Sequence, residues 1–217
     1  MSTSFFEPYI GKDYYSNNSK RTLILGSSFY CLQECQYHDE CTINSQQFDE
    51  VCPYWEKYNQ NLSQSCSIEL NEYIDGSFYR TYDNFVRRVL KISGHINNET
   101  RRKFWQSLSF YNFIQHFLSQ KQTPSYWSNK KMFNDCFPAF ERVIKNIKPQ
   151  FIVVWGAQLR EAFDDRYFKI YEKEVLKNGI HKIMILHESY EIVFIDHPSS
   201  RVYSKKQMEL VSNIILL

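Results

Sequence analysis

Thr22-Leu23-Ile24-Leu25-Gly26 is the stretch that decides the fold, because it is a short, continuous apolar run that ends in glycine. Phe151-Ile152-Val153-Val154-Trp155-Gly156 repeats the pattern directly after Pro149 and Gln150. Strands that are covered on both faces show such continuous apolar runs. Both segments are therefore predicted to be buried strands of a sheet with helices on its two sides.

Working outward from these runs, the sequence alternates between strand and helix patterns. Two β-rich runs, Lys182–Leu186 and Glu191–Ile195, flank the polar residues 187–190 and predict a hairpin. Apolar residues at helical spacing predict a helix through Phe85, Val89 and Ile92 that stops at Gly94, a helix over Phe133–Ile147, and helices over Leu159–Leu176 and Tyr203–Leu217. This order predicts an α/β fold with a mainly parallel sheet. Binding sites then collect at the carboxyl ends of the strands, in loops that begin at Gly26, near Asn112, at Gly156 and at His197.

Composition limits the class of protein. The chain has 217 residues with a net charge of +2, and 43% hydrophobic and 17% aromatic content supports a sizeable core. No apolar run approaches the length of a membrane span, and the first residues show no basic and apolar secretory pattern. We expect a single domain over residues 1–217 that is soluble, cytoplasmic and monomeric, with no membrane partner. The charge balance permits only a local basic groove.

Cysteine is concentrated early in the chain, which predicts a Cys-rich insertion at about residues 31–66. A disulfide framework is not expected, because the cytosol keeps thiols reduced. Soft ligands at short spacing make a structural zinc or iron–sulfur site the alternative to a loop with free thiols. The spacing does not repeat the Cys-x2-Cys pattern of standard zinc sites. The candidate ligands are Cys31, Cys35, His38 and Cys41.

Four short motifs lie at the predicted strand ends. They are Gly26-Ser27-Ser28-Phe29-Tyr30, Phe110-Tyr111-Asn112-Phe113, Val154-Trp155-Gly156-Ala157 and His197-Pro198-Ser199-Ser200. Their order and spacing resemble the uracil-DNA glycosylase superfamily, and the resemblance runs from Pro8-Tyr9-Ile10-Gly11 to the C-terminal helix. It implies a three-layer α/β/α domain with a central, mainly parallel, four-stranded sheet. It also implies a DNA glycosylase that flips out a uracil-like or modified pyrimidine and leaves an abasic site.

The resemblance implies a role for each motif. Asn112 reads the edge of the flipped base, since its amide offers both donors and an acceptor. His197, when neutral, donates a hydrogen bond to O2 of the base as negative charge develops there. Ser28 lies in the catalytic loop and assists by holding water. The residues implied in base or DNA binding are Gly26, Ser27, Phe29, Tyr30, Gly156, Ser199, Ser200 and Arg201, with Arg201, Val202 and Tyr203 in the place of the wedge that enters the duplex. DNA is the expected partner, and no cofactor is required.

The first motif departs from the family pattern. The well-known uracil enzymes have Gly-Gln-Asp-Pro-Tyr, and here Ser28 stands where their aspartate stabilises the sugar cation. A serine hydroxyl cannot replace an anion in that role. Three resolutions remain open: an acid such as Glu34, Asp39 or Glu40 folds back into the site, His197 alone activates the base, or the domain binds nucleic acid without cleaving it. The insertion could also reshape the pocket for a hypermodified phage base, as in a defence enzyme, although a tyrosine such as Tyr30 excludes 5-substituents in the uracil enzymes.

The same residues allow other interpretations. Asn112 could lie on the polar side of an amphipathic helix, and His197-Pro198 could be a simple turn. The rivals to a glycosylase are a catalytically silent nucleic-acid-binding domain, a metal-centred protein organised by the cysteines, and a generic small-molecule α/β enzyme. Against a small-molecule enzyme, this sequence contains neither a Gly-rich nucleotide loop nor a nucleophile elbow.

Overall fold

The computed structural model describes residues 6–30, 62–115, 117–118, 125–168, 174–175 and 179–216. Its centre consists of four parallel strands in the order β4-β2-β6-β9. They are β2 (Thr22–Gly26), β4 (Leu108–Asn112), β6 (Phe151–Trp155) and β9 (Glu188–Ile195). The two apolar runs are confirmed as buried strands, because all of β2 and all of β6 except Phe151 are buried.

Short edge strands extend this parallel centre into a seven-stranded mixed sheet within the described ranges. β1 (Tyr9–Ile10) pairs antiparallel with β4, and at the other edge β8 (His181–Ile185) and β7 (Glu174–Val175) are antiparallel too. The prediction of four strands is correct for the parallel centre and wrong for the sheet, because two-residue strands such as β1 and β7 are too short to show a pattern. β3 (Phe29–Tyr30) and β5 (Phe117–Leu118) form a separate parallel pair.

The predicted hairpin is formed by β8 and β9, with a tighter turn than expected. Leu186 and His187 have φ angles of 51° and 67°. Two consecutive positive φ angles are typical of the type I′ turn, whose twist matches that of the flanking strands. β9 therefore begins at Glu188, and most of the polar segment that was expected to connect the strands belongs to the second strand.

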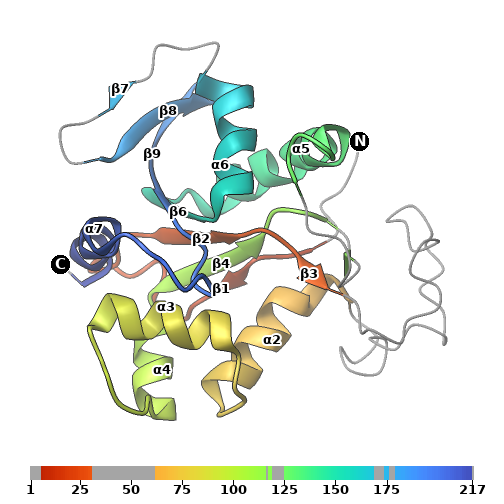
Figure 1. The fold of residues 1–217 in the computed structure, drawn as a ribbon. Helices are drawn as coiled ribbons and strands as arrows, with labels where there is room; N and C mark the ends of the chain where they lie inside the picture. Colours follow the sequence, from red (N-terminus) through yellow and green to blue (C-terminus); the bar gives the residue numbers. More distant parts are fainter. Residues whose placement is uncertain are drawn as a thin grey trace, which may run out of the picture.

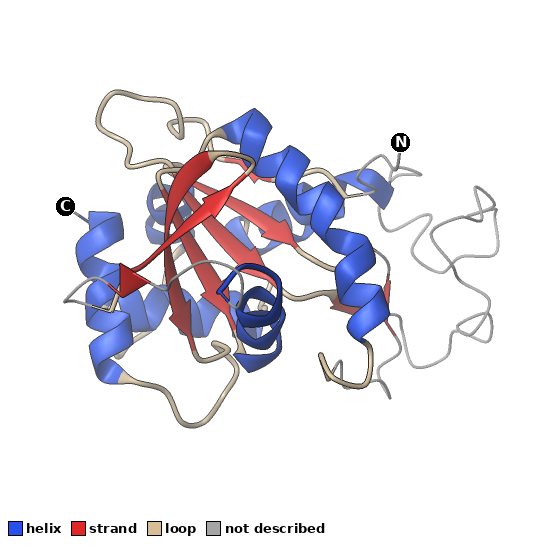
Figure 2. Ribbon diagram, turned by 90° about the horizontal axis from the view of Figure 1, so that it is seen from above, coloured by secondary structure: helices blue, strands red, loops and turns tan. Residues whose placement is uncertain are grey.

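Helices cover both faces of the sheet, which gives three layers (Figure 1). One layer holds α5 (Lys130–Ile147) and α6 (Ala157–Phe163). The opposite layer holds α2 (Ser65–Ile74), preceded by the 3-10 turn η1 (Leu62–Gln64), α3 (Arg80–Leu90), α4 (Asn98–Trp105) and α7 (Lys205–Leu216), which packs on α3 and β9. Seen from above, the parallel strands fan out with the usual twist (Figure 2). Buried side chains of all three layers form one hydrophobic cluster.

The helices differ from their predicted bounds where the backbone leaves the α conformation. α5 and α7 agree with the expected segments to within a few residues. α3 ends at Leu90, before Gly94, because Lys91 adopts a left-handed conformation with φ of 57°. The long helix predicted to reach residue 176 is wrong: α6 ends at Phe163 and continues only as the π-helical segment η2 (Asp164–Phe168). None of the described helices is long and apolar enough to cross a membrane.

A buried ion pair ties α2, α3 and α4 into one unit. Arg101 of α4 lies 3.5 Å from Asp83 of α3, and both residues are 3% exposed. Arg101 also donates to the carbonyl of Tyr73 on α2 at 2.8 Å, and the hydroxyl of Tyr73 donates to Asp83 at 3.4 Å. Since α2 and α3 form one wall of the cavity described below, this network fixes the position of that wall.

Candidate functional site

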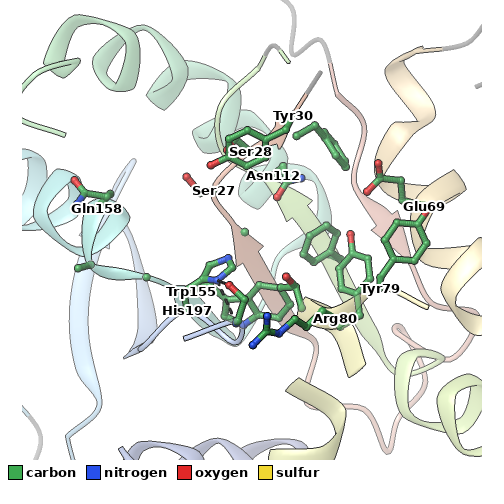
Figure 3. Close-up of a pocket in the computed structure, with 18 residues that line it drawn as sticks. Ser27, Ser28, Tyr30, Glu69, Tyr79, Arg80, Asn112, Trp155, Gln158 and His197 are labelled. Atoms are coloured by element: carbon green, nitrogen blue, oxygen red, sulfur yellow. Dashed lines mark hydrogen bonds between the residues drawn. The ribbon is translucent and has the colours of Figure 1, made fainter. Parts of the chain in front are cut away.

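A cavity of about 540 Å³ lies at the carboxyl ends of the four parallel strands (Figure 3). The end of β4 and the loops after β2, β6 and β9 reach it, as expected at the carboxyl ends of parallel strands. A volume of this size with a few convergent polar groups is typical of a small-ligand site. The residues singled out from the sequence that line it are Gly26, Ser27, Ser28, Phe29, Tyr30, Asn112, Gly156, His197 and Ser199.

Asn112 is the last residue of β4, so the helical alternative for it is wrong. Its side chain is 4% exposed and reaches the cavity (Figure 3). Gln115 braces the backbone beyond it, donating to the carbonyls of Asn112 at 2.9 Å and Phe113 at 3.1 Å. The same Gln115 accepts from the backbone N–H of Phe6 at 3.0 Å. The amide of Asn112 is thus presented from a fixed backbone.

Gly26, at the end of β2, leaves room for the close approach of Asn112. A Cβ atom at Gly26 would lie 2.3 Å from Oδ1 of Asn112, far inside van der Waals contact. The segments that follow β2 and β4 stay hydrogen-bonded beyond the strands. The backbone N–H of Phe113 donates to the carbonyl of Gly26 at 3.0 Å, and that of Ile114 donates to the carbonyl of Ser27 at 2.9 Å. The motif that begins at Gly26 and the motif that contains Asn112 are therefore joined by backbone hydrogen bonds.

Three buried polar atoms of the cavity lining have no hydrogen-bond partner among the described residues. They are the hydroxyl oxygens of Ser27 and Ser28 and the indole nitrogen of Trp155. Buried polar atoms are nearly always paired in proteins, and an unpaired one costs about 1–3 kcal/mol. The lining of the cavity therefore contains three polar groups whose hydrogen-bonding capacity is unused within the described residues.

His197 lies two residues after the end of β9 and sits on the cavity wall opposite α2 (Figure 3). The backbone N–H of Ser199 donates to Nδ1 at 3.3 Å, and Oγ of Ser199 lies 2.7 Å from the same nitrogen. Because a backbone N–H can only donate, Nδ1 accepts and the neutral ring carries its proton on Nε2. Burial, and then the positive charge of Arg88, lower the pKa of His197 below 6.5. The neutral, Nε2-protonated imidazole is the form that this loop favours.

Two residues of α3 hold the His197 loop in place. Asn84 donates to the carbonyl of Pro198 at 3.0 Å, and Arg88, one turn later, donates to the carbonyl of Ser200 at 2.8 Å. The guanidinium of Arg88 also stacks 3.9 Å over the ring of Tyr203. The loop is therefore anchored at both ends by one helix.

Ser200 and Arg201 do not line the cavity. Ser200 closes the turn, because its N–H donates to the His197 carbonyl at 2.8 Å and its hydroxyl donates to the Val202 carbonyl at 2.7 Å. Arg201 is exposed and Val202 is 80% exposed. The predicted contact of this tip with DNA stays a prediction.

Phe29 and Tyr30 line the cavity in different ways. Phe29 is 4% exposed and packs against Phe6 and Phe117, with ring centroids 5.0 Å and 5.7 Å apart. Tyr30 is 41% exposed. Of the two aromatic candidates for stacking on a base, Tyr30 is the one with an accessible ring.

The cavity wall made by α2 and α3 was not predicted from the sequence. Glu69 of α2 and Tyr79, Arg80 and Thr81 at the start of α3 line the cavity together with Tyr82. The helical periodicity of α3 marks only its buried side, and no motif surrounds Glu69. Only the tertiary packing of α2 beside β4 brings these residues to the strand ends.

The candidate metal ligands and the candidate folded-back acids lie outside the described residues, so those predictions stay open. Within the described ranges no group of three His, Cys, Asp or Glu side chains could hold a metal. Cys66, expected at the end of the insertion, lies in α2 and is fully buried, and burial raises its pKa to about 12. Burial also raises the pKa of Cys136 to about 11. Neither of these thiols is suited to act as a nucleophile.

No protein-family model matches this chain, and no curated protein matches it. The arrangement of the site is therefore the basis for assigning a function.

Proposed function

We propose that this protein is a DNA glycosylase that takes a flipped pyrimidine into the cavity and hydrolyses its glycosidic bond. The observation that carries the proposal is the meeting of Asn112 and a neutral, Nε2-protonated His197 in one cavity, although 84 residues of sequence separate them. An amide that can pair with a base edge and a donor that can meet developing negative charge are the two groups that base excision needs.

In this proposal Asn112 pairs with the base edge opposite the sugar, and His197 donates from Nε2 to O2. When the bond between C1′ and N1 breaks, its electron pair leaves with the base, and the hydrogen bond from His197 stabilises the resulting anion. A water molecule that enters the cavity beside the Ser27–Ser28 loop bonds to C1′ and loses a proton to solvent. The base takes up a proton at N1, which completes the hydrolysis.

A catalytically silent nucleic-acid-binding domain is the second candidate. The observation that favours it is the loop after β2, which presents Ser27 and Ser28 and no carboxylate to the cavity. Without an anion in this loop, the loop stabilises an oxocarbenium-like transition state less.

Base release distinguishes the two candidates. The purified protein is expected to release a base from single- or double-stranded oligonucleotides that contain uracil or a 5-substituted pyrimidine, with mass spectrometry of the free base and alkaline cleavage at the abasic site as readouts. Turnover of any substrate supports a glycosylase. DNA binding without turnover on any substrate supports the silent domain and contradicts our proposal.

A second hollow, of about 510 Å³, lies beside the His197 loop, between the end of α3 and the start of α7. Arg87, Arg88, Lys91 and Lys205 line it against a single acid, Glu209. A local excess of positive charge beside the cavity on a nearly neutral protein is suited to the phosphates that flank a flipped nucleotide.

Lys91→Ala and Lys205→Ala test whether the DNA backbone passes over this hollow. Each change is expected to weaken binding to all DNA sequences alike and to reduce the slope of log Kd against log salt concentration by about 0.9, the effect of one phosphate contact. Fluorescence anisotropy across a salt series measures the slope. Lys103→Ala is the matched control, since Lys103 pairs with Glu99 on the surface of α4. An unchanged slope in both variants would exclude this hollow from the DNA path.

A further inference from the structure

The second hollow, between the end of α3 and the start of α7, has walls that are fixed to each other. Ser212 of α7 donates to the carbonyl of Val89 on α3 at 2.8 Å, and both residues are buried. The guanidinium of Arg88 lies 3.9 Å over the ring of Tyr203, which holds the loop before α7 against α3. The hollow, of about 510 Å³, is therefore built into the packing of the two helices.

Apolar side chains and cations meet in this hollow. Met208 is 5% exposed, Ile92 is half-buried and Tyr203 is 37% exposed, so the lining contains apolar surface and an accessible ring. Lys91 and Lys205 line the same hollow and are exposed to solvent. Proteins that hold single-stranded nucleic acid combine these two features, because bases pack on the rings while the cations follow the phosphates. The lining therefore suits a whole nucleotide and not a phosphate alone.

The second hollow and the first cavity lie on the two sides of one loop. His197 lines the cavity, and the loop that it begins is held by Asn84 and Arg88, which line the hollow. The helix α3 connects the two sites as well, since Arg80 lines the cavity and Lys91 lines the hollow, about 16 Å further along the helix. A strand whose flipped base occupies the cavity can thus follow α3 and reach the hollow with one of its next nucleotides.

We propose that the second hollow binds a second base of the same strand, close to the flipped nucleotide, and that the substrate is single-stranded DNA. The proposal rests on the proposed function, because it takes the flipped base to lie in the first cavity. The phosphates of the neighbouring nucleotide meet Lys91 and Lys205, and its base packs between Tyr203, Ile92 and Met208. In a duplex this base would also have to leave its stack, at a further cost in free energy. A single strand presents both bases without that cost.

The first test removes one neighbouring base at a time and keeps every phosphate. Single strands with a central uracil carry a tetrahydrofuran spacer at one of the two positions on either side, and anisotropy at constant salt measures affinity. The wild type is expected to bind about 5- to 100-fold more weakly when the spacer takes one particular position, the effect of one base–aromatic contact. Ser93→Leu, which narrows the hollow at an exposed position, and Ile92→Ala, which removes apolar surface, are expected to reduce this penalty to about threefold or less.

Ser16→Leu is the matched control, because Ser16 is exposed and lines neither the cavity nor the hollow. It is expected to keep the wild-type penalty. A wild-type penalty below about twofold at all four positions, or one that is unchanged in both hollow variants, would overturn the second base site.

The second test compares strandedness, with the uracil of the duplex placed opposite an abasic site so that the target itself is unpaired. The single strand is expected to bind at least about 10-fold more tightly than this duplex, and a bubble that also frees the neighbouring base is expected to restore the affinity. Equal affinity for all three DNAs would overturn the assignment of a single-stranded substrate. Both tests measure binding and need no turnover. A spacer penalty without base release from any DNA would therefore overturn the proposed function and leave the second base site, whereas base release without a spacer penalty would overturn the second base site alone.

Discussion

His197→Ala is expected to lower the rate of base release by about 10²- to 10³-fold while DNA affinity is retained. The change removes the one imidazole donor among the described residues that line the cavity, and loss of a single preorganised donor to a developing anion typically costs that much. Single-turnover kinetics with enzyme in excess measure the chemical step, and anisotropy measures DNA affinity. His95→Ala is the control, since His95 is exposed in the loop between α3 and α4. Equal losses in rate and affinity would show that His197 contributes to binding and not to the reaction.

The pH dependence of the rate gives the same residue a second test. Protonation would place a hydrogen on Nδ1, where the backbone N–H of Ser199 already donates, so the charged ring conflicts with the loop. Because burial and Arg88 lower the pKa of His197, the rate is expected to fall with decreasing pH only below pH 6.5. Arg88→Met removes the nearby positive charge, which raises the pKa and moves this fall to higher pH. A profile that does not move in Arg88→Met would contradict the electrostatic role given to Arg88.

The elements that the sequence predicted correctly are those in which one local pattern determines the structure. β2 and β6 are covered on both faces, so their apolar runs had no other stable arrangement. The parallel order then placed Gly26, Asn112, Gly156 and His197 at one edge of the sheet, and the cavity is found there. The site could be located from the sequence because topology, and not side-chain packing, brings these four residues together.

The features that were missed depend on backbone conformations or on contacts across the fold. Lys91 ends α3 in a left-handed conformation that a lysine rarely adopts. The sequence pattern therefore favoured Gly94 as the end of this helix. Glu69 belongs to the site only because α2 packs beside β4 and is tied to α3 and α4 through Asp83. A glutamate on a helix has no local signature for such a role, whereas a glycine-ended strand does.

Gly26→Ala is expected to reduce base release as strongly as Asn112→Ala, by about 10²-fold or more. The new methyl group would lie 2.3 Å from Oδ1 of Asn112 and 3.1 Å from the ring of Phe110. The amide must therefore turn away from the position in which it meets the base, and a site built to pair with a polar edge loses most of its discrimination when the pairing group is absent. Steady-state kinetics of both single variants measure the effect.

The double variant decides whether the two residues act as one unit. If Gly26 serves only to leave room for the Asn112 side chain, Gly26→Ala costs little activity once Asn112→Ala is present, and the two effects are strongly non-additive. Thermal unfolding should show the same coupling, because overpacking of about 1–3 kcal/mol is partly relieved when the amide is removed. Gly94→Ala, where a Cβ meets nothing within 4 Å, is the control and is expected to be neutral. Additive losses in the double variant would mean that Gly26 contacts the substrate or the loop itself, and that the close approach to Asn112 is incidental to the reaction.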